Sequence, residues 1–156
     1  MADMYLVTGG AGFIGSNIVE ELVKRGEKVR VIDDLSTGKE ENMASFMDKV
    51  EFYKGDIRSA DDAGKAVKGA DYIIHQAARR SVAKSVEDPV STNDVNVNGT
   101  LNLLMKAAEA GARRLVYASS SSVYGDCSTY PQKETFTPKP ISPYAVSYTH
   151  LRAHET

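Results

Sequence analysis

Short apolar runs alternate along the chain with longer segments in which apolar residues recur every three or four positions. The runs have the length and composition of strands buried within a sheet, and they span residues 4–7, 28–32, 50–53, 70–75 and 114–118. The segments between them predict helices, as where Ile14, Ile18 and Leu22 share one helical face before a C-cap at Gly26. This alternation predicts an α/β fold, a doubly wound parallel sheet that is truncated after about five strands.

Two further features mark helices in the middle of the chain. Asp88 and Pro89 have the residue types of an N-cap and of a first helical position. The segment that follows carries apolar residues at i, i+3, i+4 and i+7, which are Leu101, Leu104, Met105 and Ala108. A short helix over residues 60–68 and a weaker one over 39–47 are also expected.

The turn after the first strand is rich in glycine. Gly9, Gly12 and Gly15 give the spacing G-x-x-G-x-x-G between a strand and an amphipathic helix. Such a turn lets the backbone approach a pyrophosphate closely, and N–H groups at the helix N-terminus can bind the phosphates. A glycine-rich loop can also serve only to turn the chain, but this context predicts dinucleotide binding by a Rossmann-like domain.

An acidic residue ends the second strand. Asp33 follows Gly15 by eighteen residues, where a carboxylate can accept hydrogen bonds from the adenosine ribose hydroxyls. Its charge would repel a 2′-phosphate, so NAD is predicted rather than NADP. The alternative is an aspartate that only shapes a turn. Asp56, after the third strand, would contact the adenine or cap a helix.

Composition and charge narrow the class of protein. The 156 residues include 19 basic and 21 acidic side chains, a net charge of -2, which provides no basic surface for a nucleic acid or an anionic membrane. No apolar run reaches the roughly 18 residues of a membrane span, and no signal peptide is recognisable. Cys127 is the single cysteine, and His150 and His154 have no third ligand nearby, so neither a disulfide nor a metal site is expected. These features predict a cytoplasmic protein.

Several motifs together resemble the extended short-chain dehydrogenase/reductase superfamily. They are the Thr8–Gly15 turn, Asp33, His75-Gln76-Ala77-Ala78, Asn96-Val97-Asn98-Gly99-Thr100 and the serine-rich run Ser119–Gly125. Within the superfamily the chain is most similar, over residues 4–147, to NAD-dependent UDP-glucose and UDP-N-acetylglucosamine 4-epimerases. The resemblance implies NAD as cofactor, a UDP-sugar as substrate and a homodimer when the protein is intact.

The resemblance also assigns roles to individual residues. Those implied to contact NAD are Gly9, Gly12, Phe13, Ile14 and Gly15 in the first turn, Asp33, Asp34, Leu35, Ser36, Thr37 and Gly38 around the adenosine, Asp56 and Ile57 near the adenine, and Gln76, Ala77, Ala78 and Arg80 along the nicotinamide side. Ser120 and Tyr144 are implied to be catalytic, and Ser121 and Ser122 to line the substrate site. In such enzymes a tyrosinate takes the 4′-hydroxyl proton while C4′ passes a hydride to the nicotinamide. The 4-keto sugar then turns over and takes the hydride back on its other face.

The likeness fails at one catalytic position. Free tyrosine titrates near pH 10, and such enzymes favour the tyrosinate with a lysine four residues later. Here that position is Tyr148. Residues 148–156 resemble nothing in the family and look like a foreign tail.

These departures leave alternatives open. Residues 1–147 are expected to be an incomplete NAD-binding domain that lacks the substrate domain and is inactive alone. A non-catalytic NAD-binding module is the alternative from another class. The related 4,6-dehydratases and decarboxylases are disfavoured, because they carry acidic residues just before Val-Tyr-Gly, where this chain has Ser121 and Ser122.

Overall fold

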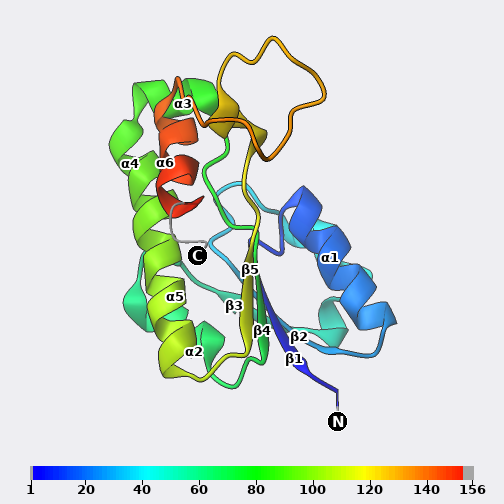
Figure 1. The fold of residues 1–156 in the computed structure, drawn as a ribbon. Helices are drawn as coiled ribbons and strands as arrows, with labels where there is room; N and C mark the ends of the chain where they lie inside the picture. The colour runs from blue at the N-terminus through cyan, green and yellow to red at the C-terminus, as the bar shows by residue number, and fades with distance from the viewer. Residues whose placement is uncertain (1, 153–156) are drawn as a thin grey trace. The chain divides into compact units, whose positions relative to one another are not determined.

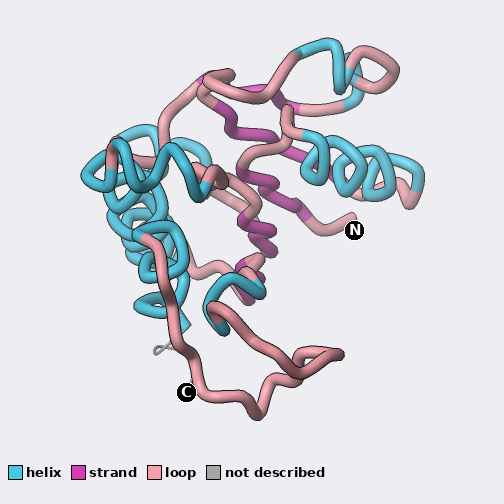
Figure 2. The backbone as a smooth tube through the Cα atoms, turned by 90° about the horizontal axis from the view of Figure 1, so that it is seen from above, coloured by secondary structure: helices cyan, strands magenta, loops and turns pink. Residues whose placement is uncertain are grey.

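The strands form one parallel sheet, as the sequence predicts. In the computed structural model, which describes residues 2–152, they are β1 (Met4–Thr8), β2 (Lys28–Asp33), β3 (Glu51–Lys54), β4 (Tyr72–His75) and β5 (Arg114–Tyr117). Their order is β3-β2-β1-β4-β5, and neighbouring strands run parallel. Figure 2 shows the strands in a single row. The prediction of an α/β fold with a Rossmann-like, doubly wound parallel sheet is confirmed.

Helices and helical turns connect the strands. The α-helices are α1 (Phe13–Lys24), α2 (Ala60–Val67), α3 (Val82–Glu87), α4 (Pro89–Asn93), α5 (Gly99–Glu109) and α6 (Pro143–Arg152). A π-helical turn, η3 (Asp94–Asn98), joins α4 to α5, and the 3-10 turns are η1 (Glu40–Met43), η2 (Met47–Lys49) and η4 (Ser121–Tyr124). The prediction of a helix over residues 39–47 is therefore wrong. Its buried side chains, Met43 and Phe46, are three residues apart, a spacing that 3-10 turns align.

The chain divides into two compact units. The first contains the sheet and consists of the residues up to Ala77 together with Gly99–Ala118. The second consists of Ala78–Asn98 and the residues from Ser119 onward. The glycine turn, Asp33 and the end of β4 thus belong to the first unit, whereas Ser120 and Tyr144 belong to the second.

Helices cover both faces of the sheet in the first unit. α1 lies on one face, and α2 with α5 lies on the other (Figure 1). Between α1 and the sheet is a cluster of buried apolar residues, Val7, Ala11, Val19, Leu22, Val29, Val31, Met43 and Phe46. Val29 and Val31 are alternate residues of β2, so both point to the same face of the sheet. This core sets the end of β1 against the start of α1.

The buried faces of α1 and α5 differ from the stripes that spacing suggests. In α1 the side buried against the turn and the sheet carries Gly15, Ser16, Val19 and Leu22. Ile14, expected on the same face as Leu22, is 58% exposed. In α5 it is Leu103 and Ala107 that are buried, while the apolar stripe of Leu101, Leu104 and Met105 is exposed. Periodicity therefore identified the helices, but packing decided which side of each is covered.

Polar groups hold the second unit together. Asp88 caps α4 by accepting a hydrogen bond from the Ser91 N–H at 3.1 Å, so the predicted N-cap is confirmed. Asn96 is 1% exposed; its amide donates to Ser147 Oγ at 3.0 Å, and its Oδ1 accepts from the Arg79 N–H at 2.8 Å. These bonds tie the 79–80 segment and α6 to the π-helical turn. Within residues 2–152, no helix has both the length and the apolar character needed to cross a membrane.

Candidate functional site

The glycine turn of the first unit is tight and closely surrounded by backbone. Gly9 has φ +68, and its N–H donates to the Ile32 carbonyl at 2.8 Å. A Cβ at Gly9 would lie 2.8 Å from the Ala77 N and Cα atoms, and one at Gly15 would lie 2.1 Å from the Gly9 carbonyl oxygen. Side chains do not fit at either position. The spacing of Gly9 and Gly15 is thus required by the packing of β1, the turn and α1.

The N-terminus of α1 opens directly from this turn. Gly12 is its N-cap, and in the described part of the chain no side chain accepts a hydrogen bond from its first turn. The N–H groups of Phe13 and Ile14 therefore lie where a helix has no intrahelical acceptors, which is a suitable place for an anion. Their side chains are 75% and 58% exposed.

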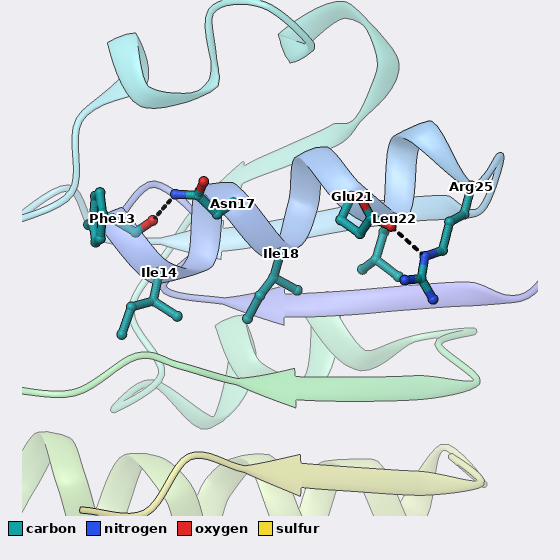
Figure 3. A pocket seen from close by; sticks show the side chains of 7 residues that line it. All are labelled: Phe13, Ile14, Asn17, Ile18, Glu21, Leu22 and Arg25. Carbon is teal, nitrogen blue, oxygen red and sulfur yellow. Dashed lines mark hydrogen bonds and ion pairs between the residues drawn. The ribbon is translucent and has the colours of Figure 1, made fainter.

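The exposed flank of α1 carries a shallow hollow of about 590 Å³ that runs along the helix. Figure 3 shows Ile14 and Ile18 projecting from the same side of α1, while Asn17 Nδ2 donates to the Phe13 carbonyl at 2.7 Å. The hollow ends at Arg25, whose guanidinium pairs with Glu21 at 2.8 Å. Apolar side chains dominate this surface, so it does not have the chemistry of a phosphate site.

Asp33 is held by the turn that it faces. Its Oδ2 accepts a hydrogen bond from the Ala11 N–H at 3.0 Å, and its Oδ1 accepts one from the Leu35 N–H at 2.9 Å. The residue is 8% exposed, and this burial raises the pKa of the carboxyl above its ordinary value, while the two N–H bonds oppose the shift. Gly38 passes so close that a Cβ there would lie 2.8 Å from Oδ1. Asp33 thus both shapes the turn and presents a carboxylate at the end of β2.

The residues after Asp33 form an exposed loop. Asp34 accepts two hydrogen bonds from Ser36, at 2.9 Å from its N–H and 2.7 Å from its hydroxyl. Leu35 has φ +59, Thr37 is exposed and Gly38 is buried. This loop lies beside the Asp33 carboxylate, and its contacts with an adenosine stay a prediction.

Asp56 and Ile57 have different surroundings. Asp56 pairs with Arg58, with 2.8 Å between Oδ2 and Nε, and this hydrogen bond lowers the pKa of the carboxyl. The alternative that Asp56 caps α2 is wrong, because Ser59 is the N-cap and accepts from the Asp62 N–H at 3.2 Å. Ile57 is 5% exposed and packs on Gly99, where a Cβ would lie 2.7 Å from Ile57 Cγ1.

The end of β4 lies beside the glycine turn. The Gln76 N–H donates to the Thr8 carbonyl at 3.1 Å, and the Ala77 N–H donates to Thr8 Oγ1 at 3.2 Å. His75 is 1% exposed, and burial lowers the pKa of its imidazole to about 4, so the ring is neutral at pH 7. Gly9, Gln76 and Ala77 are therefore brought together, and their contacts with NAD stay a prediction. The sequence offered no signal for the partners of His75.

The serine-rich segment lies in the second unit. Ser120 Oγ accepts a hydrogen bond from the Ser122 N–H at 3.2 Å and so caps the η4 turn. Ser120 and Ser121 line an open hollow of about 780 Å³ together with residues 132–135; Ser122 and Tyr144 are not among its described lining residues. Its lining includes the hydroxyl groups of Ser119, Ser120, Ser121 and Thr135, which can form hydrogen bonds with a hydroxylated ligand.

Tyr144 is buried at the start of α6. Its N–H donates to Ser85 Oγ at 3.1 Å, and its carbonyl accepts from Ser147 Oγ at 2.7 Å. Its ring meets that of Tyr148 edge-on, with 4.8 Å between centroids. Tyr148 is 4% exposed, so an aromatic ring packs where the resemblance would place a lysine. Residues 153–156 of the tail, including His154, lie outside the described residues.

Two further predicted cofactor residues, Ala78 and Arg80, belong to the second unit. Arg80 is exposed, whereas its neighbour Arg79 pairs with Asp88 at 3.2 Å. Their contact with a ligand stays a prediction.

The first unit fits NAD. A turn without side chains faces the start of α1, where backbone N–H groups can bind phosphates. A carboxylate can accept about four hydrogen bonds, and Asp33 accepts two from backbone, so a ribose diol can be accommodated. A parallel sheet with this turn at its switch point defines a dinucleotide-binding protein.

Similarity to known proteins supports the assignment to the dinucleotide-binding class. Residues 5–153 match the model of the NAD dependent epimerase/dehydratase family. A UDP-glucose 4-epimerase from Mycolicibacterium smegmatis is 46% identical over 144 residues, which are 90% of this chain and 46% of that protein. The solved structure of a Thermus thermophilus UDP-glucose 4-epimerase in complex with NAD has a TM-score of 0.89 and 41% identity, covering 97% of this chain and 49% of the other. A Streptomyces venezuelae dTDP-glucose 4,6-dehydratase with NAD bound has a TM-score of 0.88 and 36% identity, covering 94% and 48%.

The chain therefore belongs to the NAD dependent epimerase/dehydratase family. The predicted family and its cofactor are confirmed at this level. The chain spans about half the length of the curated relatives it matches.

Proposed function

We propose that this chain forms the NAD-binding part of a UDP-sugar 4-epimerase. The observation that carries the proposal is the pairing of a side-chain-free turn at the N-terminus of α1 with Asp33, which the turn itself holds in place. The similarity to UDP-glucose 4-epimerases over nine-tenths of the chain supports the reaction type. In this proposal, residues 1–147 form the NAD-binding domain, and the sugar nucleotide is bound with the help of segments beyond it.

The proposed chemistry uses residues of the second unit. NAD, when bound, supplies the hydride acceptor for oxidation at C4′ of the sugar. Ser120 donates a hydrogen bond to the 4′-hydroxyl oxygen, and the phenolic oxygen of Tyr144 takes the hydroxyl proton. Ser121 and Ser122 line the sugar site, and Arg80 supplies a positive charge near the phosphates. Support for these roles comes from the hollow beside Ser120 and Ser121 and from the anchoring of Tyr144 by Ser85.

A second candidate function is NAD binding without catalysis. The observation that favours it is Tyr148, which packs on Tyr144 at a position where the proposed chemistry needs a cation. The two candidates share the first unit and differ only in the second.

Calorimetric titration of the chain with NAD and with NADP tests the proposal. We expect NAD to bind more tightly, because the Asp33 carboxylate accepts bonds from a ribose diol and repels a 2′-phosphate. Asp33→Ala should reduce the ratio of the NADP Kd to the NAD Kd about tenfold or more, because it removes both effects. Asp48→Ala is the matched control, since it removes the same charge from an exposed aspartate of η2 that is not assigned to NAD, and it should leave the ratio unchanged. Equal affinity of the unaltered chain for both nucleotides would exclude the assignment of Asp33.

We also propose that the protein associates as a homodimer through α5. Leu101, Leu104 and Met105 form an exposed apolar stripe on this helix, and Leu104 is 40% exposed. Exposed apolar stripes of this kind are typical of helix–helix interfaces.

Sedimentation at increasing concentration should reveal reversible self-association of the chain. Leu104→Glu should weaken it, because a charge would be buried in the interface, whereas Lys24→Glu on α1 should not. A monomer at every concentration would contradict the homodimer. Association that persists in Leu104→Glu would point instead to the edge strand β5, where Val116 is 53% exposed.

A further inference from the structure

A buried hydrogen-bonded relay crosses the first unit behind the glycine turn. His75 Nδ1 lies 2.6 Å from Thr8 Oγ1, and His75 Nε2 lies 2.8 Å from Thr100 Oγ1. All three residues are at most 2% exposed. The relay therefore joins the ends of β1 and β4 to the first turn of α5 through one imidazole.

The direction of the hydrogen bonds in the relay depends on the tautomer of His75. The Ala77 N–H can only donate, so Thr8 Oγ1 accepts its hydrogen bond at 3.2 Å. A hydroxyl has one donor hydrogen and two acceptor lone pairs, so Thr8 can either donate to His75 Nδ1 or accept from it. We assign the single proton of the neutral imidazole to Nε2, which makes Thr8 the donor to Nδ1 and Thr100 Oγ1 the acceptor from Nε2. A neutral imidazole, as the burial of the ring requires, suits this arrangement.

At its Thr8 end, the relay is connected to the glycine turn. Ala77 is pinned to Thr8 by its N–H, and the preceding Gln76 N–H donates to the Thr8 carbonyl at 3.1 Å. The same Ala77 backbone touches Gly9 so closely that no Cβ fits between them. A shift of Ala77 would therefore change the wall of the turn directly.

We propose that His75 is a positioning residue for NAD: acting through Thr8, it holds the Ala77 backbone against Gly9 and so shapes the nicotinamide side of the cofactor site. This inference rests on the proposed NAD site and adds a residue that touches neither NAD nor substrate. Thr100 anchors the other end, because it fixes the imidazole to α5.

Calorimetry with two probes, NAD and AMP, separates positioning from general stability. Thr8→Val removes the acceptor of the Ala77 N–H with little change in volume, and should weaken NAD binding about tenfold. AMP has no nicotinamide half, so its affinity should change little. Thr8→Ser keeps the hydroxyl and should bind NAD like the unaltered chain. Equal losses for NAD and AMP, unchanged NAD affinity in Thr8→Val, or a loss in Thr8→Ser equal to that in Thr8→Val would each overturn the proposal.

A second measurement needs no ligand. Hydrogen exchange of the Ala77 amide should accelerate in Thr8→Val and remain slow in Thr8→Ser, and the imidazole ¹⁵N spectrum should show a proton on Nε2 alone. If Thr8→Val does not fold, Thr100→Val tests the other end of the relay with the same readouts. Absence of NAD binding by the unaltered chain would reject the proposed function, whereas a slow Ala77 amide in Thr8→Val would reject the relay itself. A proton on Nδ1 would overturn the assigned direction of the relay.

Discussion

No epimerisation of UDP-glucose or UDP-N-acetylglucosamine is expected from these 156 residues, even with saturating NAD. Free tyrosine ionises near pH 10, so about one molecule in a thousand is ionised at pH 7, and a nearby cation is needed to favour the anion. Tyr148 brings an aromatic ring to Tyr144 in place of that cation. Positioning of the sugar over the nicotinamide lowers the activation barrier by several kcal/mol more. The chain spans only about half the length of its relatives, so we expect segments needed for this positioning to be missing from the 156 residues.

The measurement is separation of the two sugar nucleotides after incubation with NAD. Tyr148→Lys alone should give no turnover, because it restores the base without the remaining sugar-binding segments. Replacing residues 148–156 with the corresponding continuation of the Mycolicibacterium smegmatis relative should restore activity. Turnover by the unaltered 156 residues would contradict the expected inactivity.

Gly15→Ala should damage both the fold and NAD binding. The new Cβ would lie 2.1 Å from the Gly9 carbonyl oxygen and 2.8 Å from the Gly10 Cα, so backbone must move. Overpacking of this kind costs about 3 kcal/mol of the free energy of unfolding. Because the start of α1 would shift away from the turn, NAD affinity should fall about a hundredfold or more.

Gly64→Ala is the matched control within a helix of the same unit. Its Cβ would meet the Lys106 side chain, with the nearest atom, Cδ, at 3.6 Å, which is an ordinary contact, so the substitution should stabilise α2 by about 0.5–1 kcal/mol. Urea unfolding gives both free energies, and calorimetry gives both NAD affinities. A Gly15→Ala chain as stable as the Gly64→Ala chain would show that the close approach of α1 to the turn is not required.

The candidate NAD site could be predicted largely from local sequence. Gly9, Gly15 and Asp33 follow strands at spacings that themselves imply a tight turn and a carboxylate at a strand end, because parallel strands end at the same edge of the sheet. For Asp33, the sequence offered ribose binding and the shaping of a turn as alternatives. Its bonds to the Ala11 and Leu35 N–H groups show that the residue shapes the turn as well as presenting a carboxylate.

Helical periodicity was informative but incomplete. Both Ile14 and Leu104 lie on apolar stripes of real helices, yet both are exposed. A stripe on a helix shows that one side is apolar, and it does not show which side the sheet covers. In α1 the answer came from Gly15, because only the side without a side chain can lie against the turn.

The sequence by itself determined the five strands, the helices α1, α2 and α5, the position of the glycine turn and the acidic residue at the end of β2. These features depend on residues close together in the chain, where periodicity and turn geometry act directly. Only the tertiary structure decided the partners of His75, because Thr8 and Thr100 lie 67 and 25 residues away from it in sequence. Their hydrogen bonds depend on the register that places Thr8 opposite His75 and on the packing of α5, and no local pattern encodes either.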